Sequence, residues 1–167
     1  MAIRRIIELG QDDVLRKHAR RVEKFDERLG ALLDDMAETM RAGNGAGLAA
    51  PQVGVLKRCV VIDRAIDGQS EGILELVNPE VVSEEGEMTV IEGCLSVPGR
   101  AGRVVRPEKV TVRAQDRRGE TFEVTGEGML AVCLCHETDH LDGVMYVDKM
   151  LEDVTEELKR RNGGGAQ

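Results

Sequence analysis

Two histidines lie four residues apart in the stretch AVCLCHETDHLDG, which runs from Ala131 to Gly143. Because four residues advance an α-helix by about 400°, His136 and His140 would point the same way to within about 40°. Two imidazoles in that arrangement can bind one metal ion. Glu137 lies too far round the helix to share that ion easily, but it can reach a water on the ion and act as a general base. The flanking stripe is apolar and buried histidines need partners, which favours ligands over surface groups.

A catalytic metal site needs a third protein ligand and one open position. The position six residues after the second histidine, where one class of zinc peptidase has a further histidine, is Tyr146. Another class uses a downstream glutamate. Glu152, Glu156 and Glu157 are available, but they lie in an ordinary charged stretch and are expected to face solvent. The residues that follow the histidines therefore provide no obvious third ligand.

Cysteines are the other candidates for the third ligand. Cys133 lies one turn before the first histidine, but three ligands on one straight helix would spread along its axis, so Cys133 is expected to line the site. Cys135 projects away from the stripe and is expected to be buried packing. Cys94 remains, in the segment EGCLSVPG (Glu92–Gly99), where the adjacent glycine lets another chain approach. A thiolate is a strong ligand for Fe²⁺ or Zn²⁺.

The composition indicates one compact domain, expected to span residues 1–167 with a frayed tail at about 162–167. Hydrophobic residues make up 41% of the chain and charged residues 32%, but aromatic residues only 2%, so the core must consist of aliphatic side chains and methionine. The net charge of −8 argues against a nucleic-acid-binding protein, whose affinity depends on clustered lysine and arginine. His18 lies in a basic stretch and is expected to be exposed.

The chain shows no apolar stretch long enough to span a membrane and no secretory signal in MAIRRIIELGQDD. It has four cysteines, an even number, but a chain of this size does not need disulfides. We therefore expect a reducing cytoplasm, with free or metal-bound thiols. Cys59, in the apolar run RCVVID, is expected to be a small core residue. A monomer is the default, since no large exposed apolar face is evident.

Helical periodicity is clearest after Asp26, which can cap a helix that ends at Gly43. Its apolar positions are Leu29, Leu32, Leu33, Met36 and Met40. The glycine-rich segment Gly43–Gly54 is expected to be a loop. The stretch MLAVCLCHETDHL is expected to be a helix. DKMLEDVTEELKRR is expected to be a terminal helix, with Leu151, Val154 and Leu158 turned inward.

Strands are expected between these helices. RCVVID reads as a buried strand, GILELVNPEVV is expected to break at Asn-Pro, and EKVTVRAQ and ETFEVT form a hairpin around DRRG. Helix, strands and helix in this order predict an α+β fold. We expect mainly antiparallel sheets packed around a central helix that carries HExxH, with an N-terminal helix and a C-terminal helix.

Three segments together resemble the peptide deformylase family. They are GAGLAAPQ (Gly45–Gln52), EGCLS (Glu92–Ser96) and HETDH (His136–His140), and they occur in the order typical of that family. HExxH alone occurs in unrelated proteins, but the three motifs in this order are highly specific. The resemblance implies that Cys94, His136 and His140 are the metal ligands. The ion would be Fe²⁺ in the cell, although Zn²⁺, Ni²⁺ or Co²⁺ could occupy the site in preparations.

The implied reaction is hydrolysis of the N-formyl group from the initiator methionine of a new polypeptide, which releases formate. The metal would activate a water, and Glu137 would take its proton and deliver it to the departing amine. The family stabilises the oxyanion with the metal, a glutamine side-chain amide and one backbone N–H. The matching positions here are Gln52 and Leu95.

The resemblance also suggests how a peptide would bind. The backbone of the glycine-rich segment and of the Cys94 segment would hold it by strand addition, and an apolar pocket would take the methionine side chain. The residues expected to bind substrate are Ala46, Gly47, Gly93, Met129, Val132 and Cys133. Glu92 and Arg106 would pair in support of the Cys94 segment.

Two rival functions differ in what they require. A zinc peptidase that uses HExxH would cleave internal peptide bonds and tolerate loss of Cys94. A non-catalytic metal-binding or thiol-sensing protein would tolerate loss of Glu137. The partner is expected to be a formylmethionyl peptide or nascent chain. A transient ribosome contact through the C-terminal basic stretch stays open, and neither direct nucleic-acid binding nor a membrane contact is expected.

Overall fold

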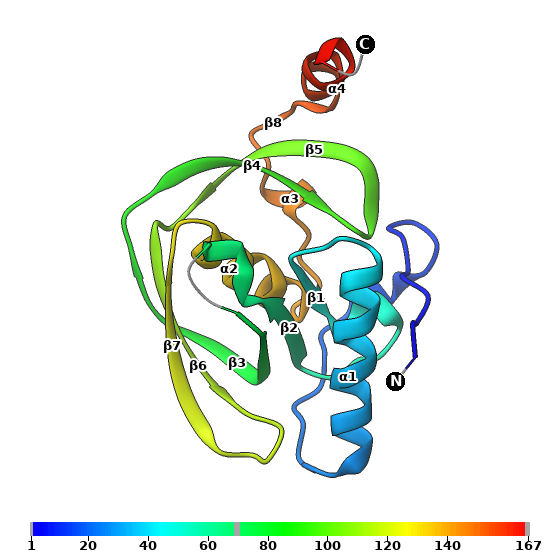
Figure 1. The fold of residues 1–167 in the computed structure, drawn as a ribbon, viewed down its shortest axis with the longest axis vertical. Coiled ribbons are helices and arrows are strands. Elements are labelled where there is room, and N and C mark those ends of the chain that lie inside the picture. Colours follow the sequence, from blue (N-terminus) through cyan, green and yellow to red (C-terminus); the bar gives the residue numbers. More distant parts are fainter. Residues whose placement is uncertain (1, 69–70, 166–167) are drawn as a thin grey trace.

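The computed structural model describes residues 2–68 and 71–165. The helices are α1 (Glu27–Ala42), α2 (Met129–His140), α3 (Tyr146–Lys149) and α4 (Thr155–Gly165), with short 3₁₀ turns at Asp13–Arg16, Ala50–Val53 and Arg64–Asp67. The strands are β1 (Gly47–Ala49), β2 (Cys59–Asp63), β3 (Ile73–Glu85), β4 (Met88–Cys94), β5 (Val97–Arg106), β6 (Lys109–Gln115), β7 (Thr121–Glu127) and β8 (Glu152–Asp153). Figure 1 shows α2 enclosed by the strands, with α1 alongside and α4 projecting from the body.

The larger sheet has five strands in the order β1-β2-β3-β6-β7, and every neighbouring pair is antiparallel. β2 is apolar on both sides because both of its faces are covered. Val60 and Ile62 pack towards α2, whereas Cys59 and Val61 pack towards α1. The β6–β7 hairpin, by contrast, alternates buried and exposed residues because only its inner face is covered. The predicted RCVVID strand and the predicted hairpin are both confirmed.

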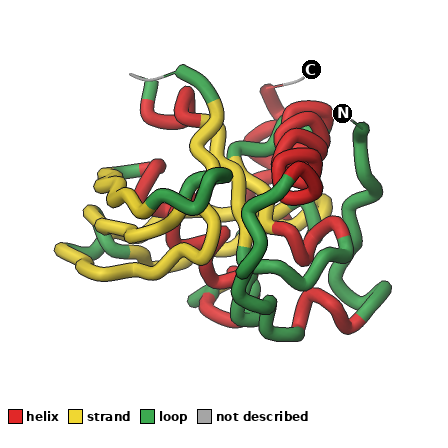
Figure 2. Tube along the Cα trace, turned by 90° about the horizontal axis from the view of Figure 1, so that it is seen from below, coloured by secondary structure: helices red, strands yellow, loops and turns green. Residues whose placement is uncertain are grey.

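Helix α1 covers the outer face of β1 and β2. Asp26 accepts a hydrogen bond from the backbone N–H of Leu29 at 3.1 Å and caps the helix, and Gly43 ends it. Its predicted apolar positions are all buried, in one cluster with Leu48 and Val61. In Figure 2 the strands gather to one side of the molecule and α1 lies on the other.

Helix α2 lies between the larger sheet and a second sheet of three strands in the order β4-β5-β8. Every residue from Leu130 to Glu137 is buried, because α2 contacts β1, β2, β3, β6 and β7 of one sheet and β5 of the other. The expected α+β architecture with antiparallel sheets is confirmed. The β4–β5 hairpin was not predicted, because its glycines interrupt the period-two pattern.

Two expectations about local structure are wrong. The segment Gly43–Gly54 is not wholly a loop, since Gly47–Ala49 pairs with β2 and Ala50–Val53 forms a 3₁₀ turn. The Asn78-Pro79 pair does not end the strand. Asn78 adopts a positive φ of 52° and its side chain bonds both backbone polar groups of Val22, so β3 continues through a shift in register. Side-chain hydrogen bonds replace the ladder bonds that proline cannot make.

The predicted single terminal helix is also wrong. Its residues divide into α3, β8 and α4, because Glu152 and Asp153 pair with β5 and Asp153 then caps α4 by accepting the backbone N–H of Thr155 at 2.9 Å. Leu151 is 67% exposed rather than inward, although Val154 is buried as expected. Residues 162–165 belong to α4, and 166–167 lie outside the described residues.

Candidate metal centre

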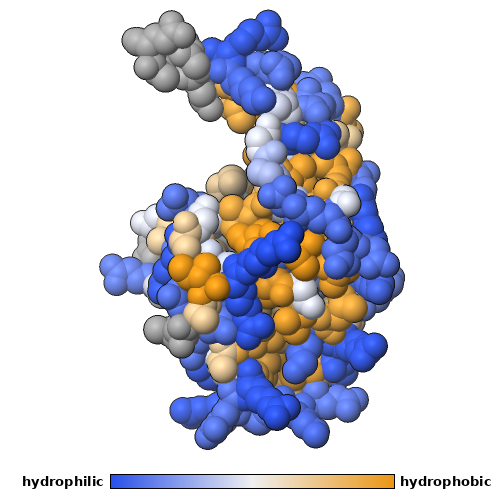
Figure 3. Space-filling model, turned by 90° about the vertical axis from the view of Figure 1, so that its right-hand side faces the viewer, coloured by the Kyte–Doolittle hydropathy of each residue, from blue (hydrophilic) through white to orange (hydrophobic). Residues whose placement is uncertain are grey.

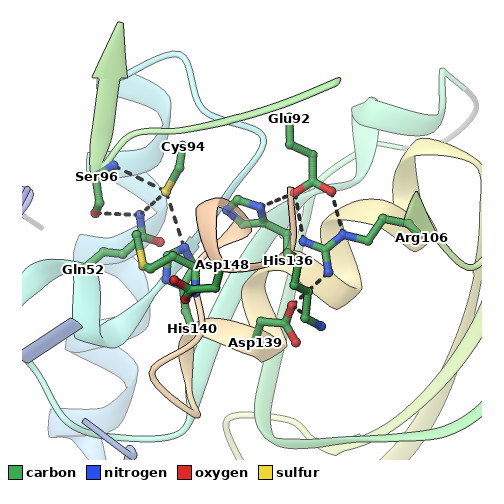
Figure 4. Close-up of polar contacts among 11 residues, drawn as sticks. Gln52, Glu92, Cys94, Ser96, Arg106, His136, Asp139, His140 and Asp148 are labelled. Atoms are coloured by element: carbon green, nitrogen blue, oxygen red, sulfur yellow. Dashed lines mark hydrogen bonds and ion pairs between the residues drawn. The ribbon is translucent and has the colours of Figure 1, made fainter. Parts of the chain in front are cut away.

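Three potential ligand atoms converge at the centre of the molecule. The Sγ atom of Cys94 and one ring nitrogen from each of His136 and His140 all lie within 4.8 Å of one another. The thiol comes from the end of β4, where the chain turns into β5, and both imidazoles come from one face of α2. Cys94 Sγ lies 3.4 Å from His140 Nε2. Figure 4 shows the two segments, far apart in sequence, facing each other.

The chemistry of this donor set fits a divalent metal ion. Burial lowers the pKa of His140 well below its ordinary value, so its ring is neutral and able to donate a lone pair. Burial has the same tendency at His136, but the negative field of Glu137, Cys94 and Glu92 outweighs it and raises the pKa of His136 well above its ordinary value. A site that attracts a proton so strongly also attracts a cation, and one thiolate with two imidazoles suits Fe²⁺, Co²⁺, Ni²⁺ or Zn²⁺.

A buried ion pair orients the first histidine. Glu92 accepts a hydrogen bond from His136 Nδ1 at 2.7 Å and two from the Arg106 guanidinium at 2.6 and 3.0 Å. Arg106 also donates to Asp139 at 2.8 Å. Burial alone would raise the pKa of Glu92, but the bonds from His136 and Arg106 lower it to about 2. Because Nδ1 donates to Glu92, Nε2 is the ring nitrogen that a metal ion can bind in exchange for its proton (Figure 4).

Replacing Glu92 by glutamine should lower metal affinity by roughly 10- to 100-fold, because His136 loses its charged orienting partner. Titration of the metal-free protein with Co²⁺ measures this. The matched control is Glu123→Gln, which also breaks a two-bond contact with an arginine, Arg113, but on the exposed face of the β6–β7 hairpin. Equal metal affinity in both variants would contradict the orienting role.

Gln52 is fixed beside the thiol. Its Oε1 accepts the backbone N–H of Ala49 at 2.9 Å, and its Nε2 donates to Ser96 Oγ at 3.0 Å and more weakly to Cys94 Sγ at 3.5 Å. Both Gln52 and Ser96 are buried. The 3₁₀ turn Ala50–Val53, which has Pro51 in its second position, aims this amide into the site. Its donor therefore points at the space next to the three ligand atoms.

Glu137 is buried on the same helix, and Oε1 is without a hydrogen-bond partner among the described residues. Burial raises the pKa of Glu137 to about 7, which suits a group that accepts and returns a proton near neutral pH. An orphaned carboxylate oxygen inside a protein is uncommon. It indicates a group whose partner is a water or a substrate.

Gly47 packs directly against this carboxylate. A Cβ atom at Gly47 would lie 2.6 Å from Glu137 Oε2 and 2.8 Å from Cys133 Sγ, closer than real contacts allow. Gly47→Ala should therefore displace Glu137 and reduce the rate of the reaction at least about tenfold. The matched control is Gly30→Ala in α1, where the added Cβ would make an ordinary 3.5 Å contact and the rate should not change. Full activity of Gly47→Ala would contradict the close packing.

A cavity of about 480 Å³ opens beside the ligands. All of the residues that were expected to bind substrate line it, namely Ala46, Gly47, Gly93, Met129, Val132 and Cys133. Gln52, Leu95, His136 and Glu137 line it too. Met129 lies at its rim, 47% exposed, whereas Val132 and Cys133 are buried deeper. We call this cavity the substrate pocket.

Three of the four thiols are shielded. Burial raises the pKa of Cys59 to about 12, that of Cys135 to about 11 and that of Cys133 well above its ordinary value. Iodoacetamide at pH 8 should therefore modify Cys94, which is only half-buried, once metal has been removed. Mass spectrometry should find this single label, and loading with metal should prevent it. Equal labelling of all four thiols in the folded protein would contradict this.

Three further residues near the site were not predicted from the sequence. Ser96 holds Gln52, Asp139 holds Arg106, and Tyr146 stacks on His136 with ring centroids 6.2 Å apart. Ser96 and Asp139 lie inside the EGCLS and HETDH motifs, so their motif positions were an available signal. Tyr146 was noted only because it occupies the position at which one class of zinc peptidase has a third histidine. The alternative ligands Glu152, Glu156 and Glu157 are all exposed, away from the cluster.

Comparison with known proteins agrees with this geometry. A family model described as polypeptide deformylase matches residues 3–156. A peptide deformylase of Acetivibrio thermocellus is 56% identical over 162 residues, covering 96% of this chain and 92% of its own. One from Caldicellulosiruptor bescii is 54% identical over 166 residues, covering 99% and 96%. A crystal structure of a peptide deformylase from Legionella pneumophila superimposes with a TM-score of 0.85 at 53% identity, covering 96% and 92% of the two chains.

Proposed function

Because the chain belongs to the polypeptide deformylase family and removes the N-formyl group from nascent polypeptides, we propose that Cys94, His136 and His140 hold the metal on which this hydrolysis depends. The single observation that carries the proposal is the convergence of these three donors within 4.8 Å. A divalent cation bound there would lower the pKa of a water and polarise the formyl oxygen. Fe²⁺ is the ion we propose in the cell, since the thiolate and two imidazoles suit it.

The proton is carried by Glu137. Its unpartnered Oε1 would accept the proton of the attacking water and afterwards deliver it to the amine that leaves the formyl carbon. The raised pKa of this carboxyl, about 7, allows both steps at neutral pH. Gly47 leaves the carboxylate room because it has no side chain. The other buried carboxylate, that of Glu92, stays ionised and acts on His136 instead.

The oxyanion would be stabilised by two donors of this chain. The Nε2 group of Gln52 needs only to turn the hydrogen that now approaches Cys94 Sγ, while Ser96 retains the other. The backbone N–H of Leu95 would supply the second donor from the same turn that carries the thiol. Removal of one such donor typically costs 10²- to 10³-fold in rate.

The peptide would bind between two sheets as an added strand. β1 is an edge of the five-stranded sheet and β4 is an edge of the three-stranded sheet. Residues adjoining both edges, Ala46 and Gly47 on one side and Gly93 on the other, line the substrate pocket. Main-chain pairing reads few side chains, so one site can accept many nascent chains. Met129, Val132 and Cys133 would then surround the methionine side chain.

The remaining proposals concern setting and assembly. We propose one metallohydrolase domain that acts as a monomer in the cytoplasm, supported by the three contiguous apolar clusters and by four unpaired thiols. Among the described residues, no helix is long and apolar enough to cross a membrane. We also propose a transient ribosome contact through Lys159–Arg161. We propose no direct binding of nucleic acid, which the net charge of −8 supports.

Cobalt substitution tests the ligand set. Co²⁺-loaded protein should contain one ion per chain and show the near-ultraviolet charge-transfer absorption of a cobalt–thiolate bond. This band should disappear in Cys94→Ser and persist in Cys133→Ser, its neighbour in the pocket. A band that depends on Cys133 instead would overturn the assignment of Cys94.

A further inference from the structure

A second depression adjoins the substrate pocket. It has a volume of about 350 Å³ and lies between β5 and the first turn of α4. Its lining residues are Gly99, Arg100, Ala101, Thr155, Leu158 and Lys159. Gly99 and Arg100 also line the substrate pocket, so the two spaces share a rim. We call the second depression the exit groove.

The groove has an apolar base and a margin of paired charges. Ala101 is buried and Leu158 is half-buried, and together they supply the apolar surface. Thr155, Leu158 and Lys159 are at positions i, i+3 and i+4 of α4 and so share one helix face. On the margin, Arg100 pairs with Asp153 and Lys159 with Glu156. Figure 3 shows hydrophobic surface on the body below the largely hydrophilic C-terminal segment.

The wall formed by α4 is fastened to β5 rather than loosely appended. β8 pairs with β5, and Val154 donates its backbone N–H to Ala101 O at 3.0 Å. Ala101 in turn donates its backbone N–H to Thr155 Oγ1 at 3.1 Å. Arg100 forms an ion pair with Asp153 at 3.0 Å. Because these contacts fix the start of α4, the groove is a preformed feature of the fold.

We propose that the exit groove binds the nascent chain beyond the residues that occupy the substrate pocket, an inference that rests on the proposed peptide-binding mode. A nascent polypeptide is far longer than the pocket, and an extended chain advances by about 3.3 Å per residue, so it must cross the rim. Gly93, which would pair with the peptide, lies against Arg100, since a Cβ at Gly93 would be 3.5 Å from the Arg100 carbonyl oxygen. A chain leaving along this side passes directly into the groove, where apolar side chains can contact Ala101 and Leu158.

Substrate length provides the test. With the Fe²⁺-loaded enzyme, a formylmethionyl nonapeptide with apolar residues after the third position should have a KM about fivefold lower than the tripeptide, the gain expected from burying a few tens of Å² of apolar surface. The kcat should not change, since the groove is away from the reacting atoms. Leu158→Asp should abolish the length effect and leave tripeptide kinetics intact. Tripeptide activity thereby reports on deformylation itself, independently of the groove.

The matched control is Leu151→Asp, the same substitution at a leucine that is 67% exposed and lines neither space. It should retain the full length effect. No length effect in the wild type, its persistence in Leu158→Asp, or an equal loss in Leu151→Asp would each overturn the proposal.

Cross-linking to the wild-type enzyme tests the proposal even if Leu158→Asp disrupts α4. A nonapeptide that carries a photoreactive benzoylphenylalanine beyond its third residue should cross-link to residues 155–159. Cross-links confined to other surfaces would overturn the proposal.

Discussion

Glu137→Ala should lower the kcat of deformylation by roughly 10²- to 10⁴-fold while the metal stays bound, because the variant lacks only the group that moves the proton. Glu137 is not among the three converging ligand atoms, and its Oε1 is without a partner among the described residues. The folded state should not suffer, since a buried carboxylate oxygen without a partner costs stability rather than adding to it. Formate release, metal content and thermal unfolding of the same preparation check the three statements.

The control for this experiment is Glu137→Gln, which keeps the size of the side chain but cannot accept the proton. It should be as inactive as the alanine variant. That result would exclude the smaller side chain of alanine as the cause of the lost activity. Retention of more than about a tenth of the wild-type rate by either variant would contradict the role of Glu137 as the proton carrier.

Cys94→Ser should lose most of its metal at the concentrations that saturate the wild type, and its activity should fall in proportion. A thiolate binds Fe²⁺, Co²⁺ or Zn²⁺ more strongly than an alcohol does. The loss of metal affinity in Cys94→Ser should therefore exceed the roughly 10- to 100-fold loss expected for Glu92→Gln, which removes only a hydrogen-bond partner of a ligand. Metal titration followed by the formate assay measures both effects.

Cys133→Ser is the matched control, because Cys133 lines the same pocket one helical turn before His136. It should retain its metal and change KM more than kcat, as expected for a wall of the methionine pocket. If Cys133→Ser lost its metal and Cys94→Ser did not, all three ligands would come from α2.

Two of the three donors of the candidate metal site lie in one short motif and could be predicted from the sequence. HExxH predicted the direction of two imidazoles from helix geometry alone. The third ligand could not be derived in that way, since Cys94 reaches the site through the pairing of β4 with β5. It was identified through the resemblance, and the structure then brought the three atoms together.

Features that depend on pairing between distant segments were harder to predict. The contact of Glu92 with His136 spans 44 residues of sequence, and no local pattern indicates it. The C-terminal stretch has helical periodicity throughout, but Glu152 and Asp153 pair with β5, which overrides that propensity. Strand β1 lies in a glycine-rich segment, which likewise reads as a loop until its pairing with β2 is seen.

Formate release from formylmethionyl peptides by the wild-type protein, prepared without oxygen and loaded with Fe²⁺, tests the central claim most directly. We predict stoichiometric formate and a free methionyl amine, with the internal peptide bonds intact by mass spectrometry. Absence of formate with Fe²⁺, Ni²⁺ and Co²⁺ alike, or cleavage of internal bonds in its place, would contradict the account.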